Sequence, residues 1–140
     1  MLADFPAPPA LALAPSDYPA LHALGRAPTI LTRLTISMTN NDFMIAYNKS
    51  QVAKTYDLLA INCSSSPALT ALLKSSFRFD LLTFTPDQVL TSPHPSLHPC
   101  QVVGGIKWTR KLYYECVERH VHFEINYAPM IRGSGDAEDF

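Results

Sequence analysis

Apolar side chains recur along the chain in two patterns that predict strands. From residue 30 to 37, Leu and Ile alternate with Thr, Ser and Arg33, so that Leu34 and Ile36 fall on a drier face and Arg33 on a wetter one. The runs YDLLAINC at 56–63 and RFDLLTF at 78–84 are almost continuously apolar, which is typical of strands buried on both faces of a parallel sheet. VHFEINYAP predicts a last strand after residue 120.

Segments with helical spacing separate these strands. SSSPALTALLKSSF carries leucines at helical spacing, with Ser66 as the expected cap and Pro67 at the first helical position. After the first strand, TNNDF predicts a turn or helix start, and AYNKSQVAKTY a short helix with Ser50 as its expected cap. KWTRKLYYECVERH, 107–120, has one apolar helical stripe. Strands separated by helices predict right-handed parallel crossovers, and therefore an α/β fold.

Proline-rich stretches suggest how the chain is divided. Residues 1–28 are expected to form a short strand, MLADF, followed by a Pro/Ala-rich linker. Residues 29–132 are expected to form the domain, in which the Pro-, Ser- and Gly-rich residues 85–106 are a loop insertion. Residues 133–140 predict a disordered acidic tail. A complete eight-stranded barrel needs about 200 residues, so this chain can build only part of one.

Composition narrows the classes of function. Of the 140 residues, 47% are hydrophobic and 16% charged, which predicts one globular unit. The formal net charge of -1 gives no global positive field, so RNA binding would have to rest on a local patch. The three cysteines are odd in number and far apart in the sequence. This pattern favours reduced thiols in a nuclear or cytosolic protein over the disulfide framework of a secreted one. Prolines interrupt the apolar N-terminus, which therefore predicts neither a signal peptide nor a membrane span.

Two groups of histidines raise the hypothesis of a metal site. His94, His98 and Cys100 lie close together in a loop, but its prolines favour a solvated loop. His120 and His122 form an H-x-H pattern, expected on one side of a strand, that also opens metal sites in amidohydrolase-type and related phosphoesterase barrels. The further His and Asp ligands of such barrels are not evident, so we expect one helix-end histidine, one strand histidine and no metal.

Other catalytic patterns are missing from the sequence. No G-x-S-x-G elbow and no P-loop occurs, and Cys63 has no recognisable base, which favours a buried structural thiol. Asp57 and Asp80 stand at strand starts, where a carboxylate more often binds a backbone donor or an arginine than performs acid–base chemistry. We therefore expect no catalytic residues and no cofactor.

Basic residues provide the remaining candidate chemistry, which is RNA binding. Lys107, Arg110 and Lys111 lie about one helical turn apart, with aromatic residues among them. Arginine binds phosphate with two hydrogen bonds and aromatic rings stack on unpaired bases, although a merely solvated helix face is an equally good interpretation. The candidate RNA-binding residues are Arg33, Lys107, Arg110, Lys111, Arg119 and Arg132.

Several stretches are close to motifs of a known family. ILTRLTI is close to its K-I-L-T-R-L-T-I strand, YDLLAI to its Y-D-(I/V/L)-(V/L)-A strand, and FDLLTF to its (V/I)-D-L-(L/V)-(T/C)-(F/I) strand. ERHVHFEINYAPMIR is close to D-R-G-(L/V)-x-(F/L)-E-(I/L)-x-Y-x-x-x-(I/L)-(R/K), and MLADF to the first strand. Over residues 28–132 and the first five, the chain resembles the thirty-kilodalton protein subunit of eukaryotic nuclear ribonuclease P and ribonuclease MRP.

The resemblance implies a fold and a role. The fold would be a TIM-like barrel related to the polymerase and histidinol phosphatase (PHP) barrels, without their metal ligands. The role would be that of a noncatalytic nuclear, nucleolar subunit, because the RNA cleaves the phosphodiester that frees the 5′ end of transfer RNA. Its partners would be the ribonuclease P/MRP RNA, pre-tRNA and other protein subunits, notably a small RRM-like one. Arg33, Arg110, Arg119 and Arg132 fall on basic positions of the family motifs, with Asp57, Asp80 and Glu124 as expected polar counterparts.

The chain also departs from the family pattern. Between its first two motifs the family has a helix, a strand and another helix, where this chain has Pro/Ala-rich sequence. The basic stretch and closing elements that follow Arg132 in the family are missing, His120 replaces a glycine, and Glu118 replaces an aspartate. HPSLHPCQVVGG resembles an insertion. We therefore expect a partial barrel with unpaired sheet edges.

Three hypotheses follow. The first is a ribonuclease P/MRP subunit that supports tRNA 5′-leader removal and pre-rRNA processing without catalysis of its own. The alternative from another class is a metal-dependent phosphoesterase barrel that uses His120 and His122. The third is an inactive remnant that folds only with a partner.

Overall fold

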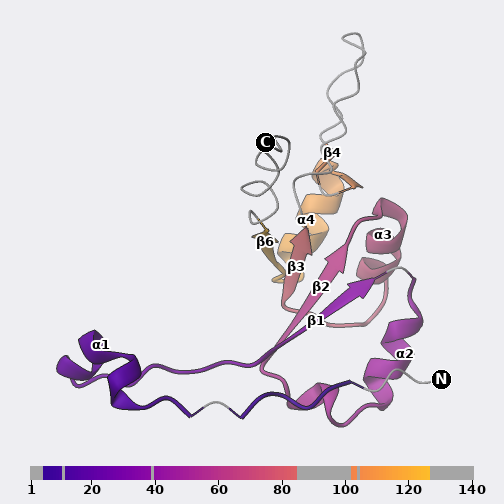
Figure 1. Cartoon of the computed structure of the whole chain (residues 1–140). Helices are drawn as coiled ribbons and strands as arrows, with labels where there is room; N and C mark the ends of the chain where they lie inside the picture. Colours follow the sequence, from indigo (N-terminus) through magenta and orange to yellow (C-terminus); the bar gives the residue numbers. More distant parts are fainter. Residues whose placement is uncertain (1–4, 11, 39, 85–101, 104, 127–140) are drawn as a thin grey trace, which may run out of the picture.

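A four-stranded parallel sheet forms the centre of the computed structural model. The structure describes residues 5–10, 12–38, 40–84, 102–103 and 105–126. The strands are β1 (Arg33–Met38), β2 (Leu58–Cys63), β3 (Leu81–Phe84) and β6 (His122–Ile125), in the spatial order β1-β2-β3-β6. Because each strand pairs with the one before it, the crossovers all step in one direction, as in an arc of a barrel (Figure 1). The predicted α/β fold, a partial TIM-like barrel, is confirmed.

The connections between the strands carry the helices. The connection before β2 contains α2 (Asp42–Lys49) and a 3₁₀ turn, η2 (Ala53–Thr55). The helix α3 (Ser66–Lys74) precedes β3, and α4 (Arg110–Glu118) precedes β6. A short antiparallel hairpin of β4 (Val102–Val103) and β5 (Ile106–Lys107) precedes α4. In the described part of the chain, no helix is both long and apolar enough to cross a membrane.

One face of the sheet is buried against these helices. In register, Ile36 of β1 lies beside Ile61 of β2, which lies beside Leu82 of β3. The buried cluster that contains these three residues also contains Leu72 of α3 and Leu112 of α4. Burying such side chains contributes roughly 1.5–3 kcal/mol each, so this layer is the main stabilising feature of the fold.

The opposite face of the sheet is more polar. Burial along β1 alternates strictly, with Arg33, Thr35 and Ser37 exposed and the residues between them buried, as the sequence predicts. The same face continues through Asn62, which is exposed, and Thr83, which is polar but buried, to Glu124 of β6. The apolar run at 56–63 predicts a strand that is buried on both faces. Strand β2 departs from this prediction at Asn62, which is exposed.

Side-chain caps begin the two longest helices. The N-cap of α3 is Ser65, not Ser66, and its Oγ accepts a hydrogen bond from the backbone N–H of Ala68 at 3.5 Å. The hydroxyl of Thr109 caps α4 by accepting from the backbone N–H of Leu112 at 3.1 Å. This cap starts α4 three residues later than the predicted residue 107, which belongs to β5.

Ser50 is not the N-cap of a short helix that the sequence predicts, because the N-cap of η2 is Val52 and makes no side-chain cap bond. Ser50 ends α2, and its hydroxyl accepts from the backbone N–H of Ala53 at 3.0 Å, at the start of η2. The helix start left open in TNNDF is real, because α2 begins at Asp42.

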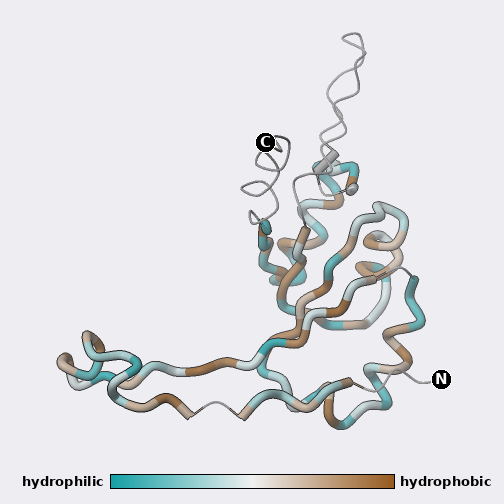
Figure 2. Tube along the Cα trace, viewed as in Figure 1, coloured by the Kyte–Doolittle hydropathy of each residue, from teal (hydrophilic) through white to brown (hydrophobic). Residues whose placement is uncertain are grey.

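The Pro/Ala-rich segment differs from the irregular linker that its prolines predict. It contains a 3₁₀ turn, η1 (Pro15–Asp17), and a short helix, α1 (Pro19–Ala23), each with proline in its first turn. Figure 1 shows this segment as an arm that runs from the N-terminal side of the body out to α1 and back to β1. We refer to residues 7–31 as the arm. Figure 2 shows hydrophobic stretches along it, and none of its described residues is buried.

The base of the arm is anchored to the body. The hydroxyl of Tyr56 donates to the carbonyl of Pro6 at 2.9 Å, and the rings of Phe5 and Tyr47 meet edge to face with centroids 6.3 Å apart. Phe5 is not in a strand, and the rest of the predicted strand MLADF lies outside the described residues. The same holds for the tail at 133–140 and for most of 85–106, whose end forms the β4–β5 hairpin. The domain boundaries stay predictions.

Candidate RNA-binding surface

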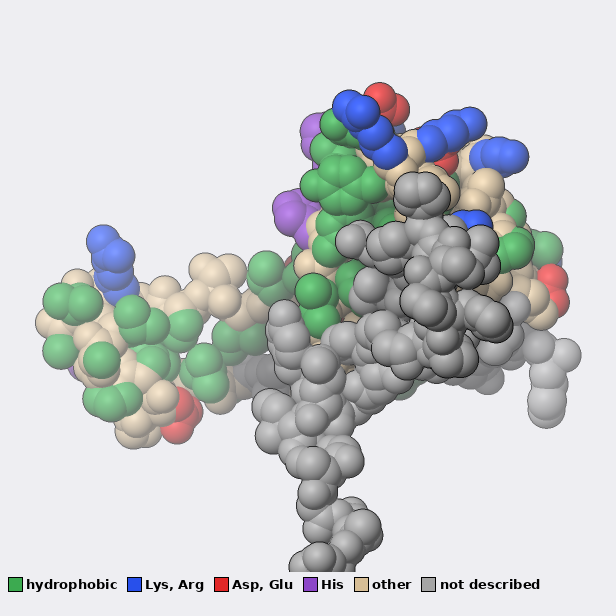
Figure 3. All heavy atoms as spheres, turned by 90° about the horizontal axis from the view of Figure 1, so that it is seen from above, with side chains coloured by type: hydrophobic (Ala, Val, Ile, Leu, Met, Phe, Trp, Pro, Cys, Tyr) green, Lys and Arg blue, Asp and Glu red, His purple; other side chains and the backbone are tan. Residues whose placement is uncertain are grey.

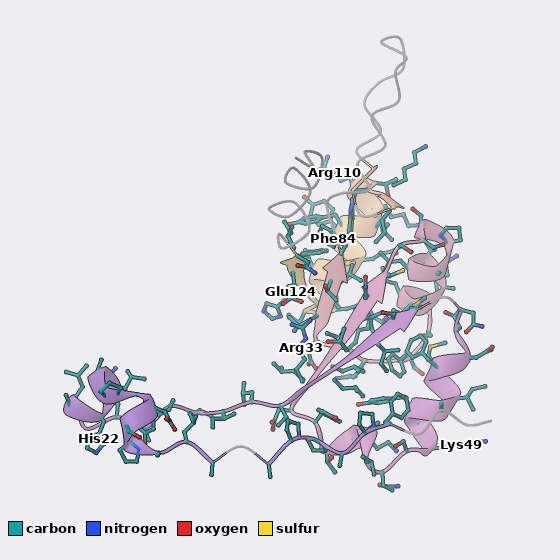
Figure 4. All side chains as sticks on the ribbon, in the orientation of Figure 1. His22, Arg33, Lys49, Phe84, Arg110 and Glu124 are labelled. Carbon is teal, nitrogen blue, oxygen red and sulfur yellow. The ribbon has the colours of Figure 1, made fainter. Side chains whose placement is uncertain are left out.

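Arg33 crosses the polar face of the sheet to form an ion pair. Its two terminal nitrogens donate to the two carboxylate oxygens of Glu124, each at 2.6 Å, and its Nε donates to the hydroxyl of Thr35 at 3.0 Å. In a flat sheet β1 and β6 would lie roughly 14 Å apart, three strand spacings. The side chains meet because the sheet curves, and Figure 4 shows the two pointing toward one another.

Hydrogen bonds from Arg33 lower the pKa of Glu124 below its usual value, despite some desolvation. The pair is half-exposed, with 33% of the Arg33 side chain and 39% of the Glu124 side chain accessible. Arg33 is therefore held in the curve of the sheet with its charge balanced, and it does not lie among the other basic candidates.

The other two expected counterparts bind backbone donors in the described part of the chain. Asp57 accepts from the N–H and the hydroxyl of Thr32 at 2.7 and 2.8 Å, which lowers its pKa. Asp80 accepts from the N–H of Leu59 at 2.8 Å. Both carboxylates therefore fix strand starts, and the interpretation as arginine partners holds for Glu124 alone.

Arg119 joins two helices. Its guanidinium donates to the carbonyls of Leu72 at 3.3 Å and Ser75 at 2.6 Å, at the end of α3. The carbonyl of Leu72 also accepts from the N–H and the hydroxyl of Ser75, and a cation at this end of a helix interacts favourably with the helix dipole. The contacts assign Arg119 a structural role that the sequence motif did not indicate.

Three lysines line one groove between α3 and α4. Lys74 of α3, Lys107 of β5 and Lys111 of α4 surround a space of about 270 Å³. Its lining also includes Ser66, Thr70 and the acidic Glu115. The backbone N–H of Lys107 donates to the hydroxyl of Ser66 at 2.7 Å, which fixes β5 against the start of α3. We call Lys74, Lys107 and Lys111 the lysine groove. Sequence reasoning missed Lys74, which it placed only on a helix.

The charges of the groove are largely free in the described structure. Lys111 is 86% exposed, and its ammonium lies 3.9 Å from the carboxylate of Glu115, a weak exposed pair. Arg110 stands one residue before Lys111, and its guanidinium lies 5.5 Å from the ring centre of Tyr114. Figure 3 shows Lys and Arg side chains gathered along one rim of the body. Arg132 lies outside the described residues.

Comparison with known proteins decides the family. The family model for RNase P subunit p30 matches residues 4–140. The chain belongs to the RNase P subunit p30 family. Neither the curated proteins nor the solved structures that were searched contain a match. The p30 match includes the arm and the residues after Arg132, beyond the motifs recognised in the sequence. Membership gives the chain the role of an RNase P protein subunit in tRNA processing, which works with RNase P RNA and other subunits.

The H-x-H pattern of this p30 family member does not form one strand site. His120 has a φ of 57° and follows α4, whereas β6 begins at His122, so the expectation that both point to one side of a strand is wrong. Within the described ranges, no three His, Cys, Asp or Glu side chains are grouped to hold a metal ion. His94, His98 and Cys100 lie outside those ranges.

The position of His120 explains why the p30 motif has glycine there. The N–H of His120 donates to the carbonyl of Val117 at 2.9 Å, and the N–H of Val121 to that of Cys116 at 3.1 Å. This Schellman motif requires a left-handed residue after the helix, which glycine adopts without strain.

The two described cysteines are buried free thiols. Burial raises the pKa of the Cys63 thiol. It is also the main cause that raises the pKa of the Cys116 thiol to about 11. Such thiols stay protonated near neutral pH and are poor nucleophiles, which agrees with the structural interpretation of Cys63.

Proposed function

We propose that this p30 family chain is a noncatalytic subunit of ribonuclease P and ribonuclease MRP that holds RNA through the lysine groove. In this role it supports removal of the 5′ leader from tRNA precursors and the processing of pre-rRNA, while the RNA subunit performs the cleavage. The observation that carries the proposal is the convergence of three lysines from α3, β5 and α4 on one groove.

The groove suits the phosphate backbone of RNA. Lysine ammonium groups neutralise phosphates without regard to sequence, and each phosphate that is neutralised releases counterions. The net charge of -1 means that this attraction is local, so the groove selects where RNA lies on the surface. A positioning role of this kind requires no acid, base or metal from the protein.

The proposal also includes the cellular setting and the partners. The partners are the ribonuclease P/MRP RNA, pre-tRNA and a small RRM-like protein subunit, and the location is the nucleus, chiefly the nucleolus. The odd number of cysteines, two of them buried as free thiols, is compatible with a reducing compartment.

A charge-removal experiment tests RNA binding. In Lys107→Ala/Lys111→Ala we expect weaker binding of RNase P RNA and a shallower dependence of affinity on salt, by about 0.7–0.9 in slope for each phosphate that the variant no longer neutralises. Lys49→Ala is the matched control, because Lys49 is an exposed lysine on α2, far from Arg110 in Figure 4. Equal affinity and slope in the double variant and the control would refute the groove.

A second experiment addresses catalysis. RNase P RNA should copurify with the tagged chain from cells, and tRNA-precursor cleavage by the assembled particle should persist in His122→Ala. Stoichiometric zinc or manganese that is lost, together with activity, in His122→Ala would contradict a noncatalytic role and favour the phosphoesterase alternative.

A further inference from the structure

A row of aromatic rings runs from the core to the surface of α4. Phe84 lies 5.8 Å from Trp108, and Trp108 lies 5.4 Å from Phe123, between ring centres. Phe123 is stacked on Tyr113 at 5.6 Å with an interplanar angle of 10°, and Tyr113 meets Tyr114 at 5.8 Å. Packing against the buried end of this row restricts the rings at its outer end.

The two tyrosines at the outer end are open to solvent. Tyr113 is 49% and Tyr114 47% exposed, although both rings are large and apolar. Exposed rings that are already held in place lose little conformational entropy when a flat ligand stacks on them. Arg110 lies over the Tyr114 ring at 5.5 Å and adds a guanidinium to the same platform.

Positive charge flanks Tyr114 on both sides. At about 100° per residue, Tyr114 lies about 40° around the helix from Arg110 and about 60° from Lys111. Lys111 belongs to the lysine groove. An RNA strand whose phosphates contact Lys107 and Lys111 would therefore bring a neighbouring base to Tyr114.

We propose that α4 binds unpaired RNA, with a base stacked on Tyr114 beside Arg110 and the adjoining phosphates in the lysine groove. This inference rests on the proposed function and narrows it to a single-stranded segment. Bases in a duplex are stacked on one another and expose no face, so a duplex can use only the lysines. A single strand uses the lysines and the ring together.

Binding of short oligonucleotides to the full chain tests the inference. We expect Tyr114→Leu to weaken binding of a single-stranded oligonucleotide roughly 5- to 150-fold, the range for loss of one base–aromatic stack. Tyr114→Phe should retain most of the affinity because it keeps the ring. Tyr18→Leu, which removes a tyrosine from the arm, is the matched control, and circular dichroism checks that each variant is folded.

Two further readouts separate stacking from charge. Replacing one nucleotide at a time by an abasic unit should, at one position, weaken wild-type binding and have little effect on Tyr114→Leu. The salt slope should stay the same in Tyr114→Leu and become shallower in Lys107→Ala/Lys111→Ala.

The outcomes distinguish the two proposals. If the lysine variants lose RNA but Tyr114→Leu binds single strands as wild type does, the stacking site is refuted and the proposed function stands. If neither set changes RNA binding, both proposals fail. A Tyr114→Leu variant that binds RNA normally but loses another protein subunit would show that the platform is a protein contact.

Discussion

The arm and the sheet region contain similar apolar side chains, which are exposed in the arm and buried in the sheet region. Leu72 of α3 is fully buried, whereas Leu24 at the end of α1 is 72% exposed. In the sheet region, strand pairing places Leu34 beside Leu59 and Ile36 beside Ile61, and the helices cover this face. Prolines in the arm supply no backbone donors to a ladder. Among the described residues of the arm, the exposed leucines are Leu13, Leu21, Leu24 and Leu31. The hydrophobicity of a side chain therefore does not by itself determine whether it is buried. Paired strands must first provide a surface against which the side chain can pack.

The largest effect on stability is expected from a leucine substitution in the core, compared with one in the arm. Leu72→Ala should lower the free energy of unfolding by about 2–5 kcal/mol, because it leaves a cavity in the core. Leu24→Ala should change it by less than about 0.5 kcal/mol. Urea denaturation followed by circular dichroism measures both, and equal losses would mean that the arm packs on the body in solution.

A smaller effect is expected where backbone conformation, not burial, matters. His120→Gly should raise the free energy of unfolding by about 1 kcal/mol, because it relieves a left-handed non-glycine residue. His122→Gly in β6 should lower it by about 0.5–1 kcal/mol. In the arm, Gly25 has a φ of 66°, and Gly25→Ala should leave the denaturation midpoint of the body unchanged. A loss of stability in His120→Gly would refute the strain.

The smallest expected effect concerns the Arg33–Glu124 pair. Glu124→Gln should lower the free energy of unfolding by about 0.5–1 kcal/mol near pH 7, since the pair is bidentate but half-exposed. The folded-state pKa of Glu124 lies below its usual 4.5, so this contribution is present above that value and is lost as the pH falls through the folded-state pKa.

Denaturation of wild type and Glu124→Gln at several pH values measures that difference. It should be constant between about pH 7 and 6 and shrink below the usual pKa of glutamate. A difference that grows on acidification would contradict the lowered pKa. Glu118→Gln, at an exposed position of α4, is a suitable control carboxylate.

Local patterns predicted most of the sheet region well. The alternation around Arg33 predicted an exposed arginine, and the run ending at Cys63 predicted a strand, because both depend on neighbours in sequence. Errors arose where caps compete: Ser65 caps α3 in place of Ser66, and Thr109 delays the start of α4. The hairpin before α4 carries too few residues to give a periodic signal.

The candidate site was predicted only in part. Lys107, Arg110 and Lys111 were recognised because they are close in sequence, whereas Lys74 belongs to another helix. Arg119 looked like an RNA contact in the motif, yet its guanidinium binds carbonyls at the end of α3. A one-dimensional pattern cannot tell which of its cations already have a partner.

The sequence by itself determined the strands of the sheet, the helices between them, the parallel α/β class and the family, since these follow from periodicity and from short motifs in a fixed order. It did not predict α1 or the β4–β5 hairpin. Only the tertiary structure decided which charges meet. Curvature of the sheet brings Arg33 to Glu124 across four strands, and the packing of α3 beside α4 brings Lys74 to Lys107 and Lys111. Such contacts depend on distances between segments far apart in the chain, which hydrophobic periodicity does not encode.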